Sequence, residues 1–245
     1  MNGVGNEFIE KTKYKYEEQS AQSKGLPQPP LETGYDLSRP LIALSKPDNA
    51  KYGQVSLIDA INNRRSVRQY SEKYLSLDEL SYLLWCTQGV KKLNSGKHTY
   101  RTVPSAGARH AFETYLLINR VEGLKPGLYR YLSLEHKLLE ITTDPGIADE
   151  VVAGCLGQGF AGKSAATFIW AADVKRMKWR YEERGYRYLH LDAGHVCQNL
   201  YLAAEAIDCG VCAIAAFEDD LINSTLGLDG KEQFVIYVAA AGKKG

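Results

Sequence analysis

Strand-like and helix-like patterns alternate along this chain from residue 56 onward, and this alternation restricts its fold more than any other feature of the sequence. Two strand-like segments, 128–131 and 137–141, are separated by a short polar turn, which predicts a β-hairpin. Because a hairpin is antiparallel, it disfavours a purely parallel sheet and favours an α+β fold. The other expected strands cover residues 114–118, 166–172, 211–216 and 234–240, and the expected helices cover 147–156, 188–207 and a short segment from Asp219.

Two further helices are predicted from residues that can cap a first turn. Ser76 with Glu79 fits a capping box, in which each side chain binds the backbone N–H of the other residue. Ser56 with Asp59 suggests a second helix start of the same kind. The helix from Ser76 is expected to end at Gly89 and to present an apolar face made of Leu77, Leu80, Leu83 and Leu84.

The first 54 residues differ from the rest and are expected to form an extended arm. Residues 7–22 are polar and compatible with a helix, which the segment 24–30 interrupts. Five of the eight prolines lie between Pro27 and Pro47, as is typical of an extended segment. We therefore predict an N-terminal arm over residues 1–54 and one folded domain over residues 55–245.

Charge and cysteine content limit the class of protein. The 30 Lys and Arg residues nearly balance 29 Asp and Glu residues, and a net charge of +1 argues against a general nucleic-acid binder. No apolar stretch reaches about 18 residues, so no membrane-spanning helix is expected. The cysteines are five and scattered, unlike a secreted disulfide framework, and the start lacks a secretory signal pattern, so a cytoplasmic protein is expected.

Residues 64–68 combine three arginines with a serine, directly after the helix expected from Ser56. Guanidinium groups form forked hydrogen bonds to phosphate, so this segment could hold a phosphate group. The alternative is a solvated helix end, where cations complement the helix dipole. The candidate side chains are Arg64, Arg65, Ser66 and Arg68.

Two short motifs have the residue spacing of a cofactor or metal site but lack the flanking elements or further ligands that such a site requires. Residues 157–162 match the spacing G-x-G-x-x-G, but they follow a helical segment and precede a strand, the reverse of a dinucleotide-binding fold. They are interpreted as a helix exit and a loop. Cys209 and Cys212 form a lone C-x-x-C without a second ligand pair, so no metal is expected; they are either buried small side chains or a redox dithiol.

Two further groups of residues are candidates for a site. Asp192, His195 and Asn199 share one face of the long helix, where they are either catalytic or bonded to neighbouring backbone. The segment 104–107, Pro-Ser-Ala-Gly, is expected at a helix start, where small side chains leave N–H groups accessible to a flat polar ring. The alternative for Ser105 is a plain helix cap.

The order of these motifs resembles that of the nitroreductase superfamily, and most closely its SagB-type or thiazole-oxidase-like dehydrogenase branch. The resemblance covers roughly residues 40–243 and is carried by 64–70, 104–107, 157–158 and 184–199. It implies an α+β fold with a mixed, largely antiparallel sheet flanked by helices. It also implies FMN bound at the interface of an intertwined homodimer.

The resemblance further implies roles for single residues in a phosphate site. Arg64, Ser66 and Arg68 would bind the FMN phosphate and ribityl chain, with Arg65 adjacent. Lys243, just after the last strand, would complete this site.

Other residues would contact the flavin ring if the resemblance holds. Gln158 would reach the pyrimidine edge of the ring, and Ala215 and Ala216 would pass it near N5. The residues that would lie against the isoalloxazine from the opposite subunit are Pro104, Ser105, Ala106 and Gly107.

One dipeptide departs from the branch. Arg180-Tyr181 stands where peptide-azoline oxidases have Lys-Tyr, and a guanidinium is a poor proton acceptor, which disfavours base-assisted azoline oxidation. Tyr181 is instead expected to donate a proton at the pocket mouth, and Arg180 to attract an anionic substrate or the nicotinamide phosphate. The run 175–180 is expected to be too charged for a buried element.

Together the motifs and the resemblance predict an FMN-dependent oxidoreductase. It would pass hydride from NAD(P)H to a small electrophile such as a nitroaromatic or a quinone. One alternative is a flavin-dependent dehydrogenase or oxidase of a peptide azoline or a small metabolite. The other is a flavin-binding subunit with little turnover.

Overall fold

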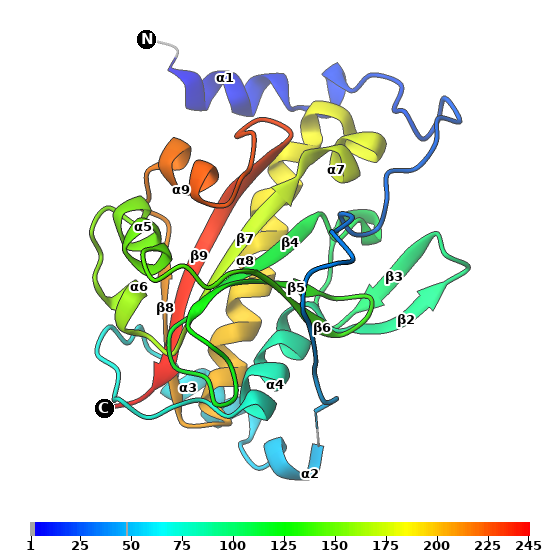
Figure 1. The fold of residues 1–245 in the computed structure, drawn as a ribbon. Coiled ribbons are helices and arrows are strands. Elements are labelled where there is room, and N and C mark those ends of the chain that lie inside the picture. The colour runs from blue at the N-terminus through cyan, green and yellow to red at the C-terminus, as the bar shows by residue number, and fades with distance from the viewer. Residues whose placement is uncertain (1–2, 48) are drawn as a thin grey trace.

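A seven-stranded sheet forms the centre of the computed structural model, which describes residues 3–47 and 49–245 (Figure 1). In spatial order its strands are β1 (Leu41–Ala43), β6 (Lys137–Thr142), β5 (Gly127–Leu132), β4 (Phe112–Ile118), β7 (Ala166–Asp173), β9 (Gln233–Lys243) and β8 (Cys209–Ile214). Neighbouring strands in this order all pair antiparallel. The expected α+β fold with a largely antiparallel sheet is confirmed, and so is the hairpin, which is β5–β6.

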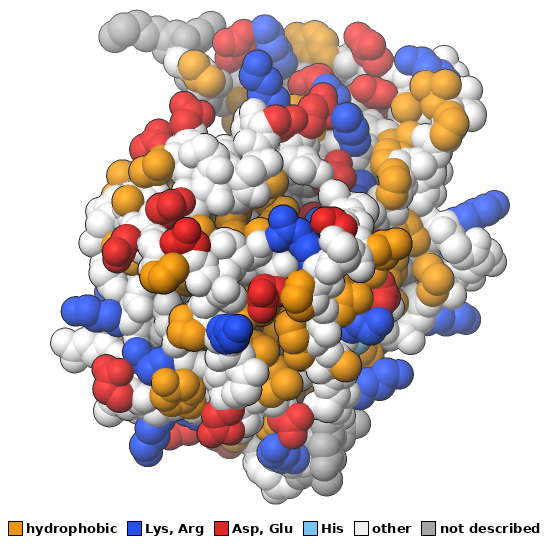
Figure 2. All heavy atoms as spheres, in the orientation of Figure 1, with side chains coloured by type: hydrophobic (Ala, Val, Ile, Leu, Met, Phe, Trp, Pro, Cys, Tyr) orange, Lys and Arg blue, Asp and Glu red, His pale blue; other side chains and the backbone are white. Residues whose placement is uncertain are grey.

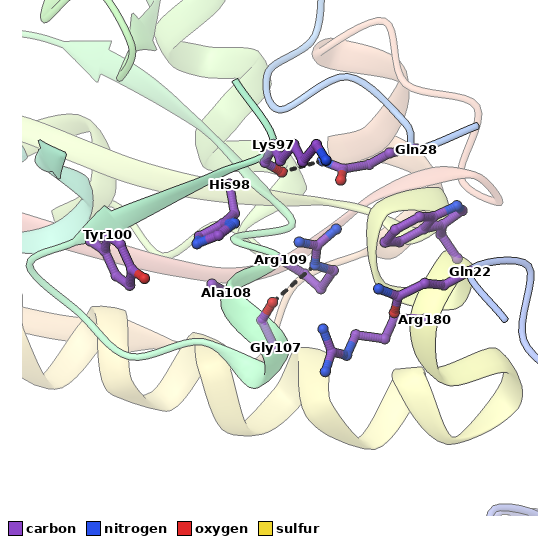
Figure 3. Close-up of a pocket in the computed structure, with 10 residues that line it drawn as sticks. Gln22, Gln28, Lys97, His98, Tyr100, Gly107, Ala108, Arg109 and Arg180 are labelled. Carbon is purple, nitrogen blue, oxygen red and sulfur yellow. Dashed lines mark hydrogen bonds between the residues drawn. The ribbon is translucent and has the colours of Figure 1, made fainter. Parts of the chain in front are cut away.

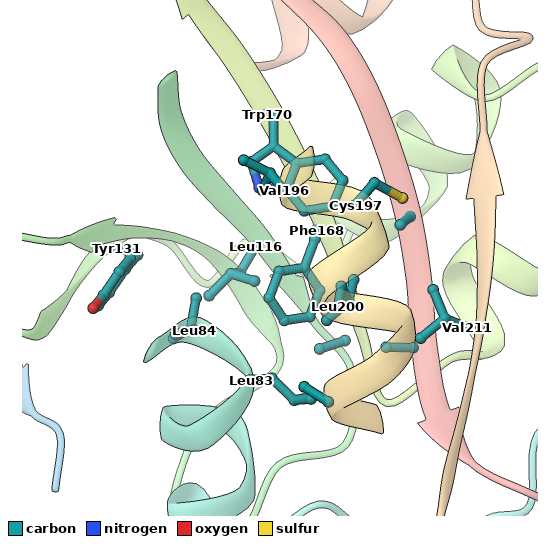
Figure 4. Packing of buried hydrophobic residues seen from close by; sticks show 14 of the residues in the cluster. Leu83, Leu84, Leu116, Tyr131, Phe168, Trp170, Val196, Cys197, Leu200 and Val211 are labelled. Atoms are coloured by element: carbon teal, nitrogen blue, oxygen red, sulfur yellow. The ribbon is translucent and has the colours of Figure 1, made fainter. Parts of the chain in front are cut away.

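Helices cover both faces of this sheet because its central strand buries side chains on both sides. In β7, Phe168 and Trp170 enter one core and Ile169 and Ala171 the other, as the two-residue period of a strand requires. Figure 4 shows the first core closed by α8 and by a helix that carries Leu83 and Leu84. The helices of this side are α3 (Leu57–Asn63), α4 (Leu77–Gln88) and α8 (Gly185–Glu205); those of the other side are α5 (Ile147–Gly154), α6 (Phe160–Lys163) and α9 (Asp219–Thr225).

The predicted capping box fixes the start of α4. The Ser76 hydroxyl accepts a hydrogen bond from the Glu79 N–H at 3.2 Å, and the Glu79 carboxylate accepts one from the Ser76 N–H at 3.0 Å. The helix ends at Gln88, and Gly89 caps it as expected. Both ends of α4 are therefore set by local sequence.

Replacing Ser76 with alanine is expected to lower the free energy of unfolding by about 1 kcal/mol, because it removes the acceptor of this cap. Urea titration followed by circular dichroism measures the change. Ser224→Ala serves as the control, since the Ser224 hydroxyl donates to a carbonyl of its own helix and its loss should cost less than about 0.5 kcal/mol. Equal stability of the two variants would contradict the assignment.

The N-terminal segment is tied to the body of the molecule by buried polar contacts. The Glu32 carboxylate accepts hydrogen bonds from the N–H of Ser133 at 2.6 Å and from its hydroxyl at 2.7 Å. The Thr33 N–H donates to Glu113 at 2.8 Å, and burial raises the pKa of Glu32. The ordered elements of this segment are α1 (Val4–Lys11), the 3₁₀ turn η1 (Tyr14–Tyr16), β1 and α2 (Asn49–Tyr52). The edge of the sheet is thus completed by the arm.

Several elements were not predicted from the sequence, among them the short β1, α2 and α6. Two others line the candidate site. One is the hairpin of β2 (Val90–Asn94) and β3 (His98–Arg101), which projects from the body (Figure 1). The other is α7 (Val174–Tyr181). The expectation that this charged run contains no buried element is wrong, because Arg176 is only 3% exposed and pairs with two carboxylates, Glu113 at 2.5 Å and Asp173 at 3.2 Å.

Candidate functional site

The segment 64–68 follows α3 and runs beside β8, an edge strand of the sheet. The Val67 N–H donates to the carbonyl of Val211 in β8 at 2.9 Å. A Cβ built on Gly210 would lie 2.5 Å from the Cβ of Val67. Glycine at position 210 therefore permits the close approach of the arginine segment to β8.

Tyr201 of α8 organises the side chains of this segment and was missed by sequence reasoning. Its hydroxyl lies 3.2 Å from the Ser66 hydroxyl and accepts a hydrogen bond from the Ala213 N–H at 2.9 Å. The guanidinium of Arg64 lies over its ring, 5.3 Å from the centroid, a cation–π distance. Its position on α8 gave no specific sequence signal, because nine residues from Asp192 correspond to the opposite face of a helix.

The cations around this segment differ in what they bind. Within the part of the chain that the structure describes, no carboxylate forms an ion pair with Arg64, Arg65 or Arg68. Lys243, by contrast, lies 2.5 Å from the Glu79 carboxylate and donates to the Ile207 carbonyl at 2.7 Å. Three unpaired guanidinium groups thus share this surface, whereas the predicted lysine already has a counter-ion.

Gln158 lies at the other end of β8. Its amide nitrogen donates to the carbonyls of Cys155 at 2.9 Å and Ala216 at 2.8 Å. No described residue donates to its amide oxygen. Ala215 and Ala216 are exposed directly after β8, so the structure brings the amide and both alanines together. The strand separates them from Val211 by about 13 Å, which suits an elongated ligand lying along the strand.

Helix α8 also holds the segment 104–107, at a point on the helix other than Tyr201. The Ala106 N–H donates to the Asp192 carboxylate at 3.2 Å, and burial raises the pKa of Asp192. This N–H is therefore engaged within the chain. The Ser105 hydroxyl accepts from the His110 N–H at 2.9 Å, and Pro104 is exposed.

Gly107 is the point at which this segment meets the predicted catalytic pair. Its φ of +56° is a conformation that favours glycine. A Cβ built there would lie 2.5 Å from the Tyr181 hydroxyl and 2.8 Å from Cδ of Arg180. The structure therefore brings Gly107, Arg180 and Tyr181 together, although the last two lie over seventy residues away in the sequence.

A cavity of about 630 Å³ opens beside this group (Figure 3). Its walls come from the arm, the β2–β3 hairpin, the Gly107 segment and α7. Arg109 lies inside it, donating to the Gly107 carbonyl at 3.1 Å, and its guanidinium lies 5.1 Å from the ring centroid of Trp179. Neither Arg109 nor Trp179 was a sequence candidate, although Arg109 follows the 104–107 motif by two residues.

The two groups of candidates lie apart within one chain. Asp192 holds the Gly107 segment and Tyr201 holds the arginine segment, and nine residues of α8 separate them, about 13 Å along the helix axis. Of the predicted polar stripe on α8, Asp192 and Asn199 bind neighbouring backbone, the latter through the Cys86 carbonyl at 2.9 Å, and His195 is exposed.

The remaining motifs have structural roles. Residues 157–162 follow α5 and precede β7, so they do not form the strand–turn–helix of a dinucleotide site. The expected loop is shorter than predicted, because residues 160–162 belong to α6. Cys209 and Cys212 are buried in β8, and burial raises the pKa of Cys209 to about 12. Across residues 3–47 and 49–245, no His, Cys, Asp or Glu cluster could hold a metal ion, and no helix is long and apolar enough to cross a membrane.

The fold and the positions of these motifs define a class of protein. Residues 61–243 match the Nitroreductase family, and the chain belongs to this family of oxidoreductases. The matched range includes both groups of candidate residues. The resemblance inferred from the sequence is confirmed.

Two relatives show the extent of the similarity. A protein of Methanocaldococcus jannaschii described as a nitroreductase is 33% identical over 191 residues, 78% of this chain and 92% of that protein. The trifolitoxin-processing protein TfxB of Rhizobium leguminosarum bv. trifolii is 30% identical over 196 residues. This second match covers 73% of this chain and 52% of TfxB, so the chain spans about half the length of that relative. The similarity to TfxB agrees with the resemblance to the SagB-type branch that the sequence motifs indicated.

Solved structures agree on the fold. A nitroreductase from Anabaena variabilis has a TM-score of 0.70 at 28% identity, covering 87% of this chain and 45% of that one. A nitroreductase from Desulfovibrio desulfuricans, solved in complex with FMN, has a TM-score of 0.55 at 19% identity, covering 78% of this chain and 88% of that one. At that identity, the second likeness concerns the fold alone.

Proposed function

We propose that this chain is an FMN-dependent oxidoreductase that transfers hydride from NAD(P)H to a small electrophile of the nitroaromatic or quinone type. The observation that carries the proposal is the group of three guanidiniums at residues 64–68, which have no carboxylate partner among the described residues. A phosphate monoester supplies the missing charge and accepts forked hydrogen bonds. The FMN complex of a family neighbour supports the choice of flavin.

In this proposal the arginine segment and β8 hold one FMN along its length. Arg64, Ser66 and Arg68 bind the phosphate and ribityl chain, with Arg65 adjacent. Gln158 offers its free amide oxygen to the N–H of the pyrimidine edge, while Ala215 and Ala216 leave space for the ring near N5. Lys243 remains a predicted member of the phosphate site whose ammonium would have to leave Glu79.

The flavin supplies the two-electron chemistry when bound, and the protein positions it and the substrate. Tyr181 presents a hydroxyl that no described residue engages, at the edge of the Gly107 segment. A phenol is protonated near neutral pH and can donate a proton to a reduced electrophile. Arg180 stays charged and attracts anions but accepts no proton. This pair favours reduction of an electrophile over abstraction of a proton from an azoline.

The separation of the two candidate groups supports a homodimer in which each flavin site is built from both chains. The arginine segment would come from one chain and residues 104–107 from the other. The outer face of α8 suits such an interface, since Leu191 is 60% exposed and a Cβ built on Gly194 meets no described atom within 4 Å. Leu57 and Ile58 of α3, a helix that contacts α8, are also exposed, by 67% and 62%.

We expect a dimer in sedimentation velocity at micromolar concentration, and Leu191→Arg is expected to shift it toward monomer because it places a charge in the apolar interface. Leu221→Arg on α9 is the control, because it adds the same charge to the opposite side of the sheet. A monomeric wild-type protein that retains FMN would contradict the shared site.

Rapid mixing of the FMN-loaded protein with NADH or NADPH tests the reaction itself. Loss of the oxidised flavin absorbance within milliseconds to seconds, followed by its return with a quinone, is the expected result. The relation to the trifolitoxin-processing protein favours a second candidate, oxidation of a peptide azoline. Bleaching by an azoline peptide but by neither nicotinamide would support that candidate and contradict ours.

A further inference from the structure

We propose that the cavity beside Gly107 recognises an anionic group on the reaction partner, and that Arg109 and Arg180 are the residues that bind it. The anion is a carboxylate or a phosphate attached to a molecule whose flat reducible or oxidisable ring reaches Gly107. The inference deepens the proposed function, on which it rests, by naming the substrate class of that site.

The charge of the cavity is one-sided. Its basic lining residues are Lys97, Arg109 and Arg180, and none of its lining residues is Asp or Glu. Figure 2 shows a face of the molecule on which Lys and Arg are instead interspersed with Asp and Glu. The positive charge is therefore a local property of the cavity, in a chain whose net charge is only +1.

Arg109 is a buried cation in this cavity. The residue is 7% exposed, and its partners are the Gly107 carbonyl and the Trp179 ring. The described residues offer no acceptor to its two terminal nitrogens. Arg176, at a similar 3% exposure, has both Glu113 and Asp173 as ion-pair partners. Arg101 and Arg130, each 5% exposed, form no ion pair with the described residues either, but their terminal nitrogens donate to Gln88 and to backbone carbonyls. The terminal nitrogens of Arg109 have neither kind of partner among the described residues, so they are available to an anion.

The guanidinium of Arg180 adds a second positive charge, which further favours binding of an anion. Arg109 and Arg180 flank the same residue, one bonded to the Gly107 carbonyl and the other 2.8 Å from a Cβ built on it (Figure 3). Burial, followed by the charge of Arg180, lowers the pKa of Arg109. Two like charges in one cavity repel, and an anion between them removes the repulsion.

The shape of the cavity defines the rest of the ligand. Its volume of about 630 Å³ suits a small molecule, and the rings of His98, Tyr100 and Trp179 offer flat apolar surfaces. An anion held at Arg109 and Arg180 places the rest of the molecule toward Gly107 and Tyr181. The class is therefore a planar electrophile with a carboxylate; the same contacts would suit the 2′-phosphate of NADPH.

The test compares ligands of equal shape and different charge on the FMN-loaded protein. We expect kcat/KM for 4-nitrobenzoate to exceed that for 4-nitrobenzamide by 10-fold or more, and Arg109→Gln to remove this preference. If the recognised anion is the phosphate of NADPH, the same variant removes a preference for NADPH over NADH instead. Equal values for both pairs in the wild-type protein would overturn the proposal.

Two further variants guard against loss of folding and against unspecific charge effects. Arg180→Gln changes an exposed side chain without a hydrogen bond to the described residues, and it should also reduce the preference. Lys92→Gln removes a charge from the same hairpin outside the cavity and should leave the preference intact. A preference that survives in both arginine variants, or is lost equally in Lys92→Gln, contradicts the assignment.

Binding without turnover separates this proposal from the proposed function. Calorimetry with benzoate and benzamide needs no reaction, and benzoate should bind at least 10-fold more tightly. If benzoate binds so but neither nicotinamide bleaches the flavin, the function fails and the anion site stands. If a neutral quinone is reduced while benzoate and benzamide bind alike and NADPH is not preferred to NADH, the function stands and the anion site fails.

Discussion

Replacing Arg64 with alanine is expected to weaken FMN binding by about 10–150-fold. A hydrogen bond between a charged donor and phosphate contributes about 1.5–3 kcal/mol, and each 1.4 kcal/mol is tenfold in the dissociation constant. Arg64 is suited to this role because it lies over the Tyr201 ring, 5.3 Å from its centroid, and pairs with no described carboxylate. Its guanidinium is therefore held in place before the ligand arrives, and less entropy is lost on binding.

Titration of the apoprotein with FMN, followed by flavin fluorescence, measures this effect. Tyr201→Phe should weaken binding less, since it keeps the ring under Arg64 but removes the hydroxyl that meets Ser66 and the Ala213 N–H. Arg39→Ala is the matched control, because Arg39 is an exposed arginine outside the proposed site. An FMN dissociation constant unchanged in Arg64→Ala would remove the phosphate assignment.

Local sequence was sufficient to predict most of the elements that bury an apolar face. The capping box at Ser76 and the mostly apolar run of the buried strand β7 are each formed by residues close together in the chain. The long helix was predicted to begin at Tyr188, whereas it begins at Gly185, after the turn η3 (Glu182–Arg184). The start of α8 has no side-chain cap. Such a helix start leaves no local signal in the sequence. The division of the chain at residue 54 stays a prediction.

The two missed elements that line the candidate site differ in the sequence signal that they carry. The β2–β3 hairpin carries mostly polar side chains and packs few of them, so its sequence has no buried face to detect. Helix α7 does carry an apolar stripe of Val174, Met177 and Tyr181 at helical spacing, and the first two are buried, but four charged residues lie between them. The helix also buries Arg176, because Glu113, 63 residues earlier, supplies a carboxylate in the core. A buried ion pair between distant residues cannot be inferred from spacing in one sequence.

In the candidate site, too, contacts between residues distant in the sequence could not be predicted. The arginine segment and residues 104–107 were found as motifs, but Asp192 and Tyr201, which hold them, became recognisable only from their contacts. Arg109 was overlooked because a single arginine after a motif is usually solvated, and only its burial beside Trp179 distinguishes it. Sequence therefore identified the candidate segments, while the structure identified the residues that position them and the cavity beside Gly107.

Tyr181→Phe is expected to lower turnover of a quinone or nitroaromatic by up to about 10²-fold while FMN is retained. The hydroxyl of Tyr181 lies close to Gly107, 2.5 Å from where a Cβ on that residue would be. None of the described residues forms a hydrogen bond with this hydroxyl. Its loss removes a proton donor, and general acids contribute about 10²-fold at the lower end of their range. The ring would keep its edge-on contact with Tyr188 at 4.8 Å, so phenylalanine should leave the fold intact.

Steady-state kinetics with NADPH, NADH and a neutral quinone decide the role of Tyr181. Because the missing proton is needed only when the electrophile is reduced, the variant should slow reoxidation of the flavin and leave its reduction by nicotinamide unchanged. Tyr188→Phe is the control, since the Tyr188 hydroxyl meets Tyr14 at 2.8 Å and Arg184 at 2.7 Å, away from Gly107. Wild-type rates of both half-reactions in Tyr181→Phe would show that this tyrosine is a solvated residue of the pocket mouth, and the proton would then have to come from solvent.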